Sequence, residues 1–313
     1  MFQFPPQYEH YVYPLTTFTE RCILFLAKFS VLRTILLKLF TFEIAPKTSV
    51  FAQTIGMENS RNPSAERKTC LYPMVIDEKM TSLIARSCKQ QQVSMHGALK
   101  TATAFAMSEI ILQAAAEKGL AAGELNDGCI TSAAVLDRHR TDFSYVTSQL
   151  FNIPHTINVN KYAPAVAAAN DEQAADFWTL AKDMMRDLNA SRDQGKRNWL
   201  VMHYLNIGHA RRYYRGNRRQ AYLMSISNVG NCNYLNRDAA AAGLKITAQF
   251  SGTGEHNADP VINTTVTSFN NKIYWAAVYF PNVTSKEFAV RLLQRSIAVL
   301  LDNCRKTVVE TTD

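Results

Sequence analysis

The sequence of 313 residues predicts a mixed α/β fold. Three observations support this prediction. Short strand-like runs alternate with longer helical patterns after residue 69, capping signals mark helix starts, and the pair Asn270-Asn271 separates two strand-like runs. Apolar residues make up 47% of the chain and charged residues 19%, which indicates a globular protein with a sizeable core.

The first part of the alternating region predicts two strands and two helices. Asp77 is placed to cap one helix, and Ser94 to cap a second that runs toward Gly119. The apolar, β-branched run at 129 to 136 suits a buried strand. In order, we predict a strand at 69 to 76, helices at 78 to 91 and 94 to 119, and a strand at 129 to 136.

The second part predicts further strands and a final helix. Asp171 opens a helix whose apolar stripe indicates core: Phe177, Trp178, Leu180, Ala181, Met184, Met185 and Leu188. A helical stretch runs through Trp199, His203 and Tyr214, and Thr284 with Glu287 forms a capping box for the last helix. Strands are predicted at 151 to 159, 220 to 229, 244 to 250, 261 to 269 and 273 to 280.

Residues 15 to 44 form the most apolar stretch of the chain. Its apolar runs are broken by Arg21, Lys28, Arg33 and Lys38, so it does not provide the roughly 20 mostly apolar residues of a bilayer span. Two interpretations remain: a helix that packs on another lobe, or an in-plane helix on a membrane surface. Residues 45 to 68 read as a polar connector.

Charge and cysteine content limit the environment. The net charge of +8 suits an anionic partner, but does not choose between a cofactor phosphate, a membrane and a nucleic acid. Six cysteines lie far apart without zinc or redox spacing, so we expect buried free thiols and no metal site. The N-terminus lacks the pattern of a secretory signal, which favours a cytoplasmic location with peripheral membrane contact as a further possibility.

Four segments, in this order, resemble the alcohol acetyltransferase and condensation-domain superfamily, whose members share the chloramphenicol-acetyltransferase-like fold. The resemblance covers roughly residues 70 to 305. It implies a mixed sheet flanked by helices, as one lobe of a two-lobe acyltransferase. The segments are residues 93 to 99, residues 134 to 138, Ser227-Asn228-Val229-Gly230, and the paired runs 264 to 269 and 273 to 279.

The superfamily motif His-His-x-x-x-Asp-Gly, whose second histidine is the general base, is missing. None of the seven histidines is followed by an aspartate four positions later. We therefore expect residues 69 to 313 to be a C-terminal lobe and residues 1 to 68 a helical bridge and linker. The chain is expected to be a fragment of a transferase or a separate protein that retains this lobe.

The resemblance implies a substrate channel beside the Ser-Asn-x-Gly step. Ser227 and Asn228 would line it on the oxyanion side, and Gly230 would let the backbone approach a ligand. The alternative is that this step merely ends a strand in a turn. The sequence assigns no catalytic residue.

Two groups of arginines are further candidates. The resemblance implies that Arg138 is a structural anchor for an aspartate in the other lobe; Arg140 is an alternative, and a solvated basic cluster is the simpler interpretation. A second cluster could bind the phosphates of coenzyme A, anionic lipid or RNA, or form a solvated turn. Its members are Arg211, Arg212, Arg215, Arg218 and Arg219.

His96 lies near a predicted helix start, within a segment that the resemblance makes structural. Packing is therefore the expected role, since a helix N-terminus also disfavours the protonated imidazole.

The resemblance implies acyl transfer from a CoA or carrier thioester to an alcohol or amine, with no bound cofactor. The general base is missing, so we expect no activity from this chain alone; the alternative is a non-catalytic protein that binds acyl chains, lipid or a partner. In either case, a first lobe or another partner would cover the exposed face. No RNA-binding signature accompanies the basic cluster, so nucleic acid is not the predicted partner.

Overall fold

A computed structural model describes residues 22, 29, 68–119, 129–136, 150–157, 177–186, 189, 224–241, 243–252, 262–281 and 284–309. Within these ranges the predicted mixed α/β fold is confirmed. The strands are β1 Cys70–Ile76, β2 Cys129–Leu136, β3 Leu150–Ile157, β4 Met224–Asn231, β5 Ile262–Phe269 and β6 Lys272–Tyr279. The helices are α5 Glu78–Gln90, α6 Met95–Glu117, α9 Tyr234–Ala241 and α10 Lys286–Val309, and residues 177 to 186 are also helical.

The six strands form one mixed sheet in the order β1-β6-β5-β4-β2-β3. The central pairs β2 with β4 and β4 with β5 are parallel, and the other pairs are antiparallel. Each edge strand contains a proline, Pro73 in β1 and Pro154 in β3. Proline lacks the backbone N–H that a central strand needs, so these residues suit the two edges.

The predicted caps and the predicted hairpin are present. Asp77 Oδ1 accepts a hydrogen bond from the Met80 amide at 2.8 Å, and Ser94 Oγ accepts one from the Gly97 amide at 3.0 Å. Asn270 and Asn271 join β5 to β6 with φ values of 49° and 59°. Positive φ at both central residues is the geometry of a two-residue hairpin turn that follows the sheet twist.

The start of α10 differs from the prediction by one residue. The Ser285 hydroxyl, and not that of Thr284, accepts the hydrogen bond from the Phe288 amide, at 3.1 Å. The Ser285 carbonyl also accepts the first helical bond, from Ala289, at 3.2 Å. Thr284 is buried instead. Adjacent serine and threonine residues give nearly the same capping signal in a sequence.

The predicted strand at 244 to 250 is wrong. These residues form no strand, and the unpredicted helix α9 precedes them. Side chains hold the segment, because Asn236 Oδ1 accepts from the Ile246 amide at 3.0 Å and the Tyr274 hydroxyl donates to the Thr247 carbonyl at 3.1 Å. The apolar content of the segment thus packs on the sheet without joining its ladder.

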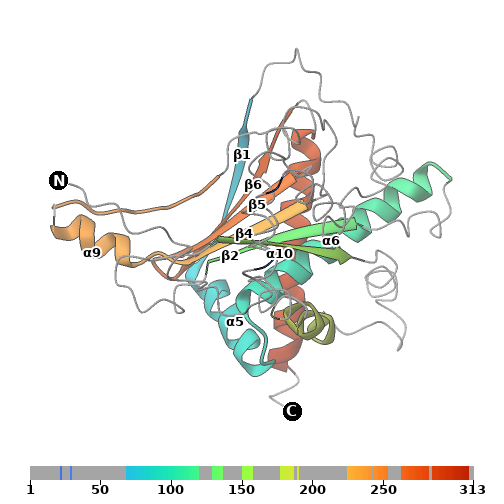
Figure 1. Ribbon diagram of the computed structural model, residues 1–313. Coiled ribbons are helices and arrows are strands. Elements are labelled where there is room, and N and C mark those ends of the chain that lie inside the picture. Colours follow the sequence, from blue (N-terminus) through green and yellow to red (C-terminus); the bar gives the residue numbers. More distant parts are fainter. Residues whose placement is uncertain are drawn as a thin grey trace.

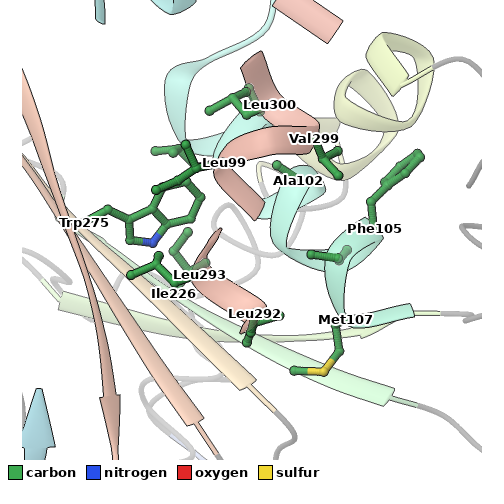
Figure 2. Close-up of a cluster of buried hydrophobic side chains, with 14 of the residues drawn as sticks. Leu99, Ala102, Phe105, Met107, Ile226, Trp275, Leu292, Leu293, Val299 and Leu300 are labelled. Atoms are coloured by element: carbon green, nitrogen blue, oxygen red, sulfur yellow. The ribbon is translucent and has the colours of Figure 1, made fainter. Parts of the chain in front are cut away.

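The helices α5, α6 and α10 cover one face of the sheet, as Figure 1 shows. Trp275 from β6 and Ile226 from β4 turn toward these helices and meet Leu99 and Leu293 in the core (Figure 2). All four side chains are at most 1% exposed. The helical stretch 177 to 186 joins the same core, which confirms the predicted burial of Phe177, Trp178, Leu180, Ala181 and Met184.

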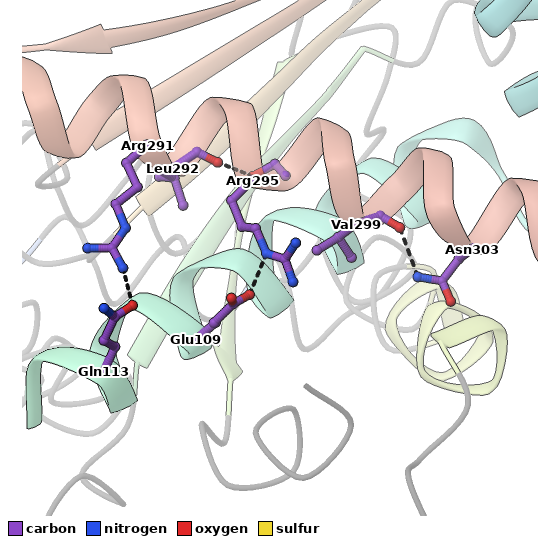
Figure 3. A network of polar contacts seen from close by, with 8 residues as sticks. Glu109, Gln113, Arg291, Leu292, Arg295, Val299 and Asn303 are labelled. Carbon is purple, nitrogen blue, oxygen red and sulfur yellow. Dashed lines mark hydrogen bonds and ion pairs between the residues drawn. The ribbon is translucent and has the colours of Figure 1, made fainter. Parts of the chain in front are cut away.

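Two polar contacts join α6 to α10 along their exposed side (Figure 3). Arg295 Nε lies 2.6 Å from Glu109 Oε2, and Arg291 donates to the Gln113 side-chain carbonyl. Neither Arg295 nor Glu109 is fully buried, so solvent screens this ion pair. The contacts set the register of two helices whose stability comes mainly from the apolar side chains between them.

The prediction of buried free thiols is confirmed for Cys88, Cys232 and Cys304, whereas the free thiols of Cys22 and Cys70 are only half-buried. Burial raises the pKa of Cys88 to about 12, with a further contribution from nearby Cys304. Burial also raises the pKa of Cys304 to about 11, against a lowering contribution from its contact with Ser87. At neutral pH both thiols are therefore protonated and unreactive.

Candidate functional site

The Ser-Asn-x-Gly step lies at the end of β4, in the middle of the sheet. Asn228 pairs with Val266 of β5, which pairs with Trp275 of β6. Paired residues share a face, so Asn228 lies on the face of Trp275, which Figure 2 shows turned toward the helices. Ser227 is one residue earlier and therefore lies on the opposite face. We call this opposite face the second face.

A bulge follows Asn228. Pairing with β5 shifts between Asn228 and Gly230, because Asn228 lies opposite Val266 and Gly230 opposite the next residue, Thr267. Val229 is thus the extra residue of β4. Asn228 Oδ1 accepts a hydrogen bond from the Gly230 amide at 2.9 Å, and Gly230 has a φ of 82°. Glycine adopts this conformation without the penalty that a Cβ atom brings.

Residues 246 to 252 cover part of the second face. The Thr265 hydroxyl donates to the Ser251 carbonyl at 2.5 Å, and Gly252 packs against Leu71 and Val278. The covered strands are therefore β5, β6 and β1. Ser227, on the neighbouring strand β4, is half-buried at the border of this cover.

The side chains around Ser227 on the second face are neutral hydrogen-bonding groups. Ser225 Oγ donates to Asn263 Oδ1, and the hydroxyls of Ser251 and Thr267 lie 3.5 Å apart. Among the described residues, the Ser227 hydroxyl has no hydrogen-bond partner. It is therefore available as a donor to a carbonyl or an oxyanion.

A group of asparagines, which sequence analysis missed, holds the strand end in place. Asn233 Oδ1 accepts from the Asn270 amide at 2.7 Å, and Asn236 Nδ2 donates to Asn270 Oδ1 at 3.0 Å. Asn231 Oδ1 also accepts from the Asn233 amide at 2.9 Å. These bonds tie the end of β4 and α9 to the hairpin turn. The signal was present as closely spaced asparagines after β4, since asparagine side chains often bond to nearby backbone.

His96 lies in the first turn of α6 and does not face an accessible site. The residue is half-buried, but both ring nitrogens are inaccessible and have no hydrogen-bond partner among the described residues. Burial, with a smaller contribution from the charge of nearby Lys100, lowers the pKa of His96 to about 4. The imidazole is therefore neutral at physiological pH, and in this position it cannot reach an acceptor hydroxyl. This supports the packing role predicted for His96.

The predicted arginine sites lie outside the described residues. Strand β2 ends at Leu136, two residues before Arg138. The anchoring role of Arg138 and the anion-binding role of the cluster from Arg211 to Arg219 therefore stay predictions. So does the helix at 15 to 44, of which the structure describes Cys22 and Phe29 alone.

Neither a metal-binding cluster nor a membrane-spanning helix is found in the described part of the chain. No cluster of three or more histidine, cysteine or acidic side chains there is suited to hold a metal ion. In the same residues, no helix combines the length and the apolar character that crossing a bilayer requires.

Comparison with solved structures shows that the chain shares its fold with condensation domains and related domains. The epimerization domain from the third module of tyrocidine synthetase B aligns over 94% of this chain and 60% of its own, with a TM-score of 0.54 and 11% identity. The condensation domain from Monacolin K polyketide synthase aligns over 92% and 60%, with a TM-score of 0.54 and 9% identity.

An acetyltransferase is also similar. Trichothecene 15-O-acetyltransferase from Fusarium sporotrichioides aligns over 85% of this chain and 54% of its own, with a TM-score of 0.53 and 10% identity. The chain thus spans between half and two thirds of the length of these structures. No family model matches the sequence, and no curated protein matches it. The similarity therefore establishes the fold, and the predicted fold is confirmed.

Proposed function

We propose that this chain forms one lobe of an acyltransferase that uses a CoA or carrier thioester and transfers its acyl group to an alcohol or amine. In this proposal residues 69 to 313 are the lobe and residues 1 to 68 the helical bridge and linker. The Ser227 hydroxyl carries the proposal, because it has no hydrogen-bond partner among the described residues and lies on a central strand of a fold shared with condensation and acetyltransferase domains.

Ser227 would donate a hydrogen bond to the thioester carbonyl, and more strongly to the oxyanion that forms when an acceptor attacks it. Its immediate neighbours on the second face, Ser225, Asn263, Thr265 and Thr267, are neutral. An uncharged part of the ligand suits such a surface, since a charged group would lose hydration there without gaining a partner of opposite charge. The phosphates of coenzyme A would have to bind elsewhere, and the cluster from Arg211 to Arg219 is the candidate from sequence.

The chain would bind thioester without catalysing transfer. The sequence lacks the His-His-x-x-x-Asp-Gly motif that supplies the base, and His96 is buried where it cannot replace it. The inaccessibility of His96 also favours a second candidate function, a non-catalytic protein that binds acyl chains, lipid or a partner. In that case the basic, apolar segment at 15 to 44 would be a membrane contact.

Titration with acetyl-dethia-CoA tests binding of the acyl group. In this ketone analogue of acetyl-CoA a methylene replaces the thioester sulfur, so the carbonyl oxygen stays in place but the acyl group cannot be transferred. We expect Ser227→Ala to weaken binding by about tenfold, the value of one well-placed hydrogen bond. Ser225→Ala is the matched control: it removes a hydroxyl from the same face of the same strand, but one already bonded to Asn263. Failure of the unsubstituted chain to bind the probe, or equal effects of the two substitutions, would argue against the proposal.

A further inference from the structure

The two polar side chains of the Ser-Asn-x-Gly step point in different directions. Alternation along β4 puts Ser227 on the second face and Asn228 on the face that carries Trp275 and the helices. A ligand lying on the second face can therefore meet the Ser227 hydroxyl, but is separated from the Asn228 side chain by the sheet itself.

The Asn228 side chain already has a structural partner. Its Oδ1 atom accepts the Gly230 amide hydrogen at 2.9 Å, across the bulged residue Val229. Without this bond the Gly230 amide would need another acceptor, because the bulge removes it from the regular ladder. The bond therefore stabilises the bulge over an unbulged strand.

The bulge fixes where Gly230 lies. Val229 is on the second face by simple alternation and packs there against the small apolar cluster of Cys232, Phe269 and Tyr274. The bulge brings Gly230 to the same face, opposite Thr267, and a Cβ atom built on Gly230 would meet no described heavy atom within 4 Å. An unbulged strand would instead pair Gly230 with Ser268 and move it to the other face.

We infer that Asn228 is a positioning residue that acts through Oδ1: by holding the bulge it keeps Gly230, and the open space beside it, on the same face as Ser227, and it does not touch the acyl ligand. The inference rests on the proposed function for the role of Ser227. The two adjacent residues of the motif thus have different roles: Ser227 contacts the ligand, and Asn228 holds the backbone.

Two substitutions separate this role from direct contact. Asn228→Asp keeps an oxygen acceptor for the Gly230 amide but removes the Nδ2 donor, whereas Asn228→Ala removes both. Binding of acetyl-dethia-CoA to the full chain should fall about tenfold in Asn228→Ala, as in Ser227→Ala, and stay within about twofold of the unsubstituted value in Asn228→Asp. Asn303→Ala is the matched control, since it removes a half-buried asparagine that bonds the Val299 carbonyl at 2.8 Å on the distant helix α10.

Hydrogen exchange of the Gly230 amide, followed by NMR with ¹⁵N-glycine, reports on the bulge independently of any ligand. We expect slow exchange in the unsubstituted chain and in Asn228→Asp, and exchange at least about tenfold faster in Asn228→Ala. Loss of acetyl-dethia-CoA binding in Asn228→Asp with the Gly230 amide still protected would overturn the inference, because the Nδ2 group would then contact the ligand. Full binding by Asn228→Ala with a fast-exchanging amide would also overturn it.

The two proposals fail in distinguishable ways. If the unsubstituted chain does not bind acetyl-dethia-CoA, the proposed function is refuted and the ligand role of Ser227 with it. The Gly230 amide then still decides whether Asn228 holds the bulge, since equal exchange in all variants would refute that part as well.

Discussion

Replacing His96 with phenylalanine should remove a defined part of the acid sensitivity of this fold. The folded-state pKa of His96 is lowered to about 4 from 6.5, mainly by burial and further by Lys100. Below pH 6.5 the unfolded chain therefore binds a proton that the folded chain does not, so stability falls as the pH drops from 6.5 toward 4. The stability that depends on a neutral His96 is therefore fully present at neutral pH.

The size of the effect follows from proton linkage. A shift from 6.5 to about 4 removes about 2 kcal/mol of unfolding free energy between pH 7.5 and pH 5, and about 3 kcal/mol by pH 4. His96→Phe keeps an aromatic ring but has no titrating group. Between pH 7.5 and pH 5, the unfolding free energy of His96→Phe should therefore fall by about 2 kcal/mol less than that of the unsubstituted protein.

Urea unfolding of the full chain at several pH values, followed by tryptophan fluorescence, measures this difference. Trp178 and Trp275 are buried and report on the core. At neutral pH the substitution should change the unfolding free energy little. Neither ring nitrogen of His96 has a hydrogen-bond partner among the described residues, so phenylalanine removes no hydrogen bond there. Parallel stability curves for the two proteins between pH 7.5 and 5 would refute the assignment of His96 as a neutral, desolvated group.

Two further predictions concern α10. Ser285→Ala should lower the unfolding free energy by about 1 kcal/mol through loss of the helix cap, and a glycine at the same position should cost less than alanine; an unchanged urea midpoint would show that Ser285 is not the cap. A double-mutant cycle on Glu109 and Arg295, using alanine at each, should give a coupling energy of about 0.5 kcal/mol that shrinks in 1 M salt, because both side chains are partly exposed. A coupling above about 3 kcal/mol, or one unaffected by salt, would contradict this description of the pair.

Local signals in the sequence predicted much of the sheet and its helices. Asp77 and Ser94 each have the side chain and the position that a helix start requires, and the structure confirms both caps. Asn270-Asn271 predicted the hairpin for the same reason, because few residue types tolerate positive φ at both turn positions. These features depend on residues close together in the chain.

Features that depend on distant residues were not predictable in this way. The segment at 244 to 250 has a strand-like composition, but the sheet positions next to β5 and β6 are already taken by other strands. It lies on the second face instead, where Asn236 and Tyr274 bond to its backbone. The resemblance likewise marked Ser227 and Asn228 together as channel residues, whereas the opposite directions of their side chains follow from the register with β5.

The central proposal is that this lobe offers the Ser227 hydroxyl to an acyl thioester, while the sequence lacks the motif that would supply the general base. Acetyl transfer from acetyl-CoA to a medium-chain alcohol by the full chain tests it most directly. We predict no rate above the uncatalysed reaction, because a general base typically contributes a factor of about 10²–10⁴. The sequence lacks the motif that supplies this base, and the ring nitrogens of His96 are buried. Turnover well above background that disappears in His96→Ala would contradict the account.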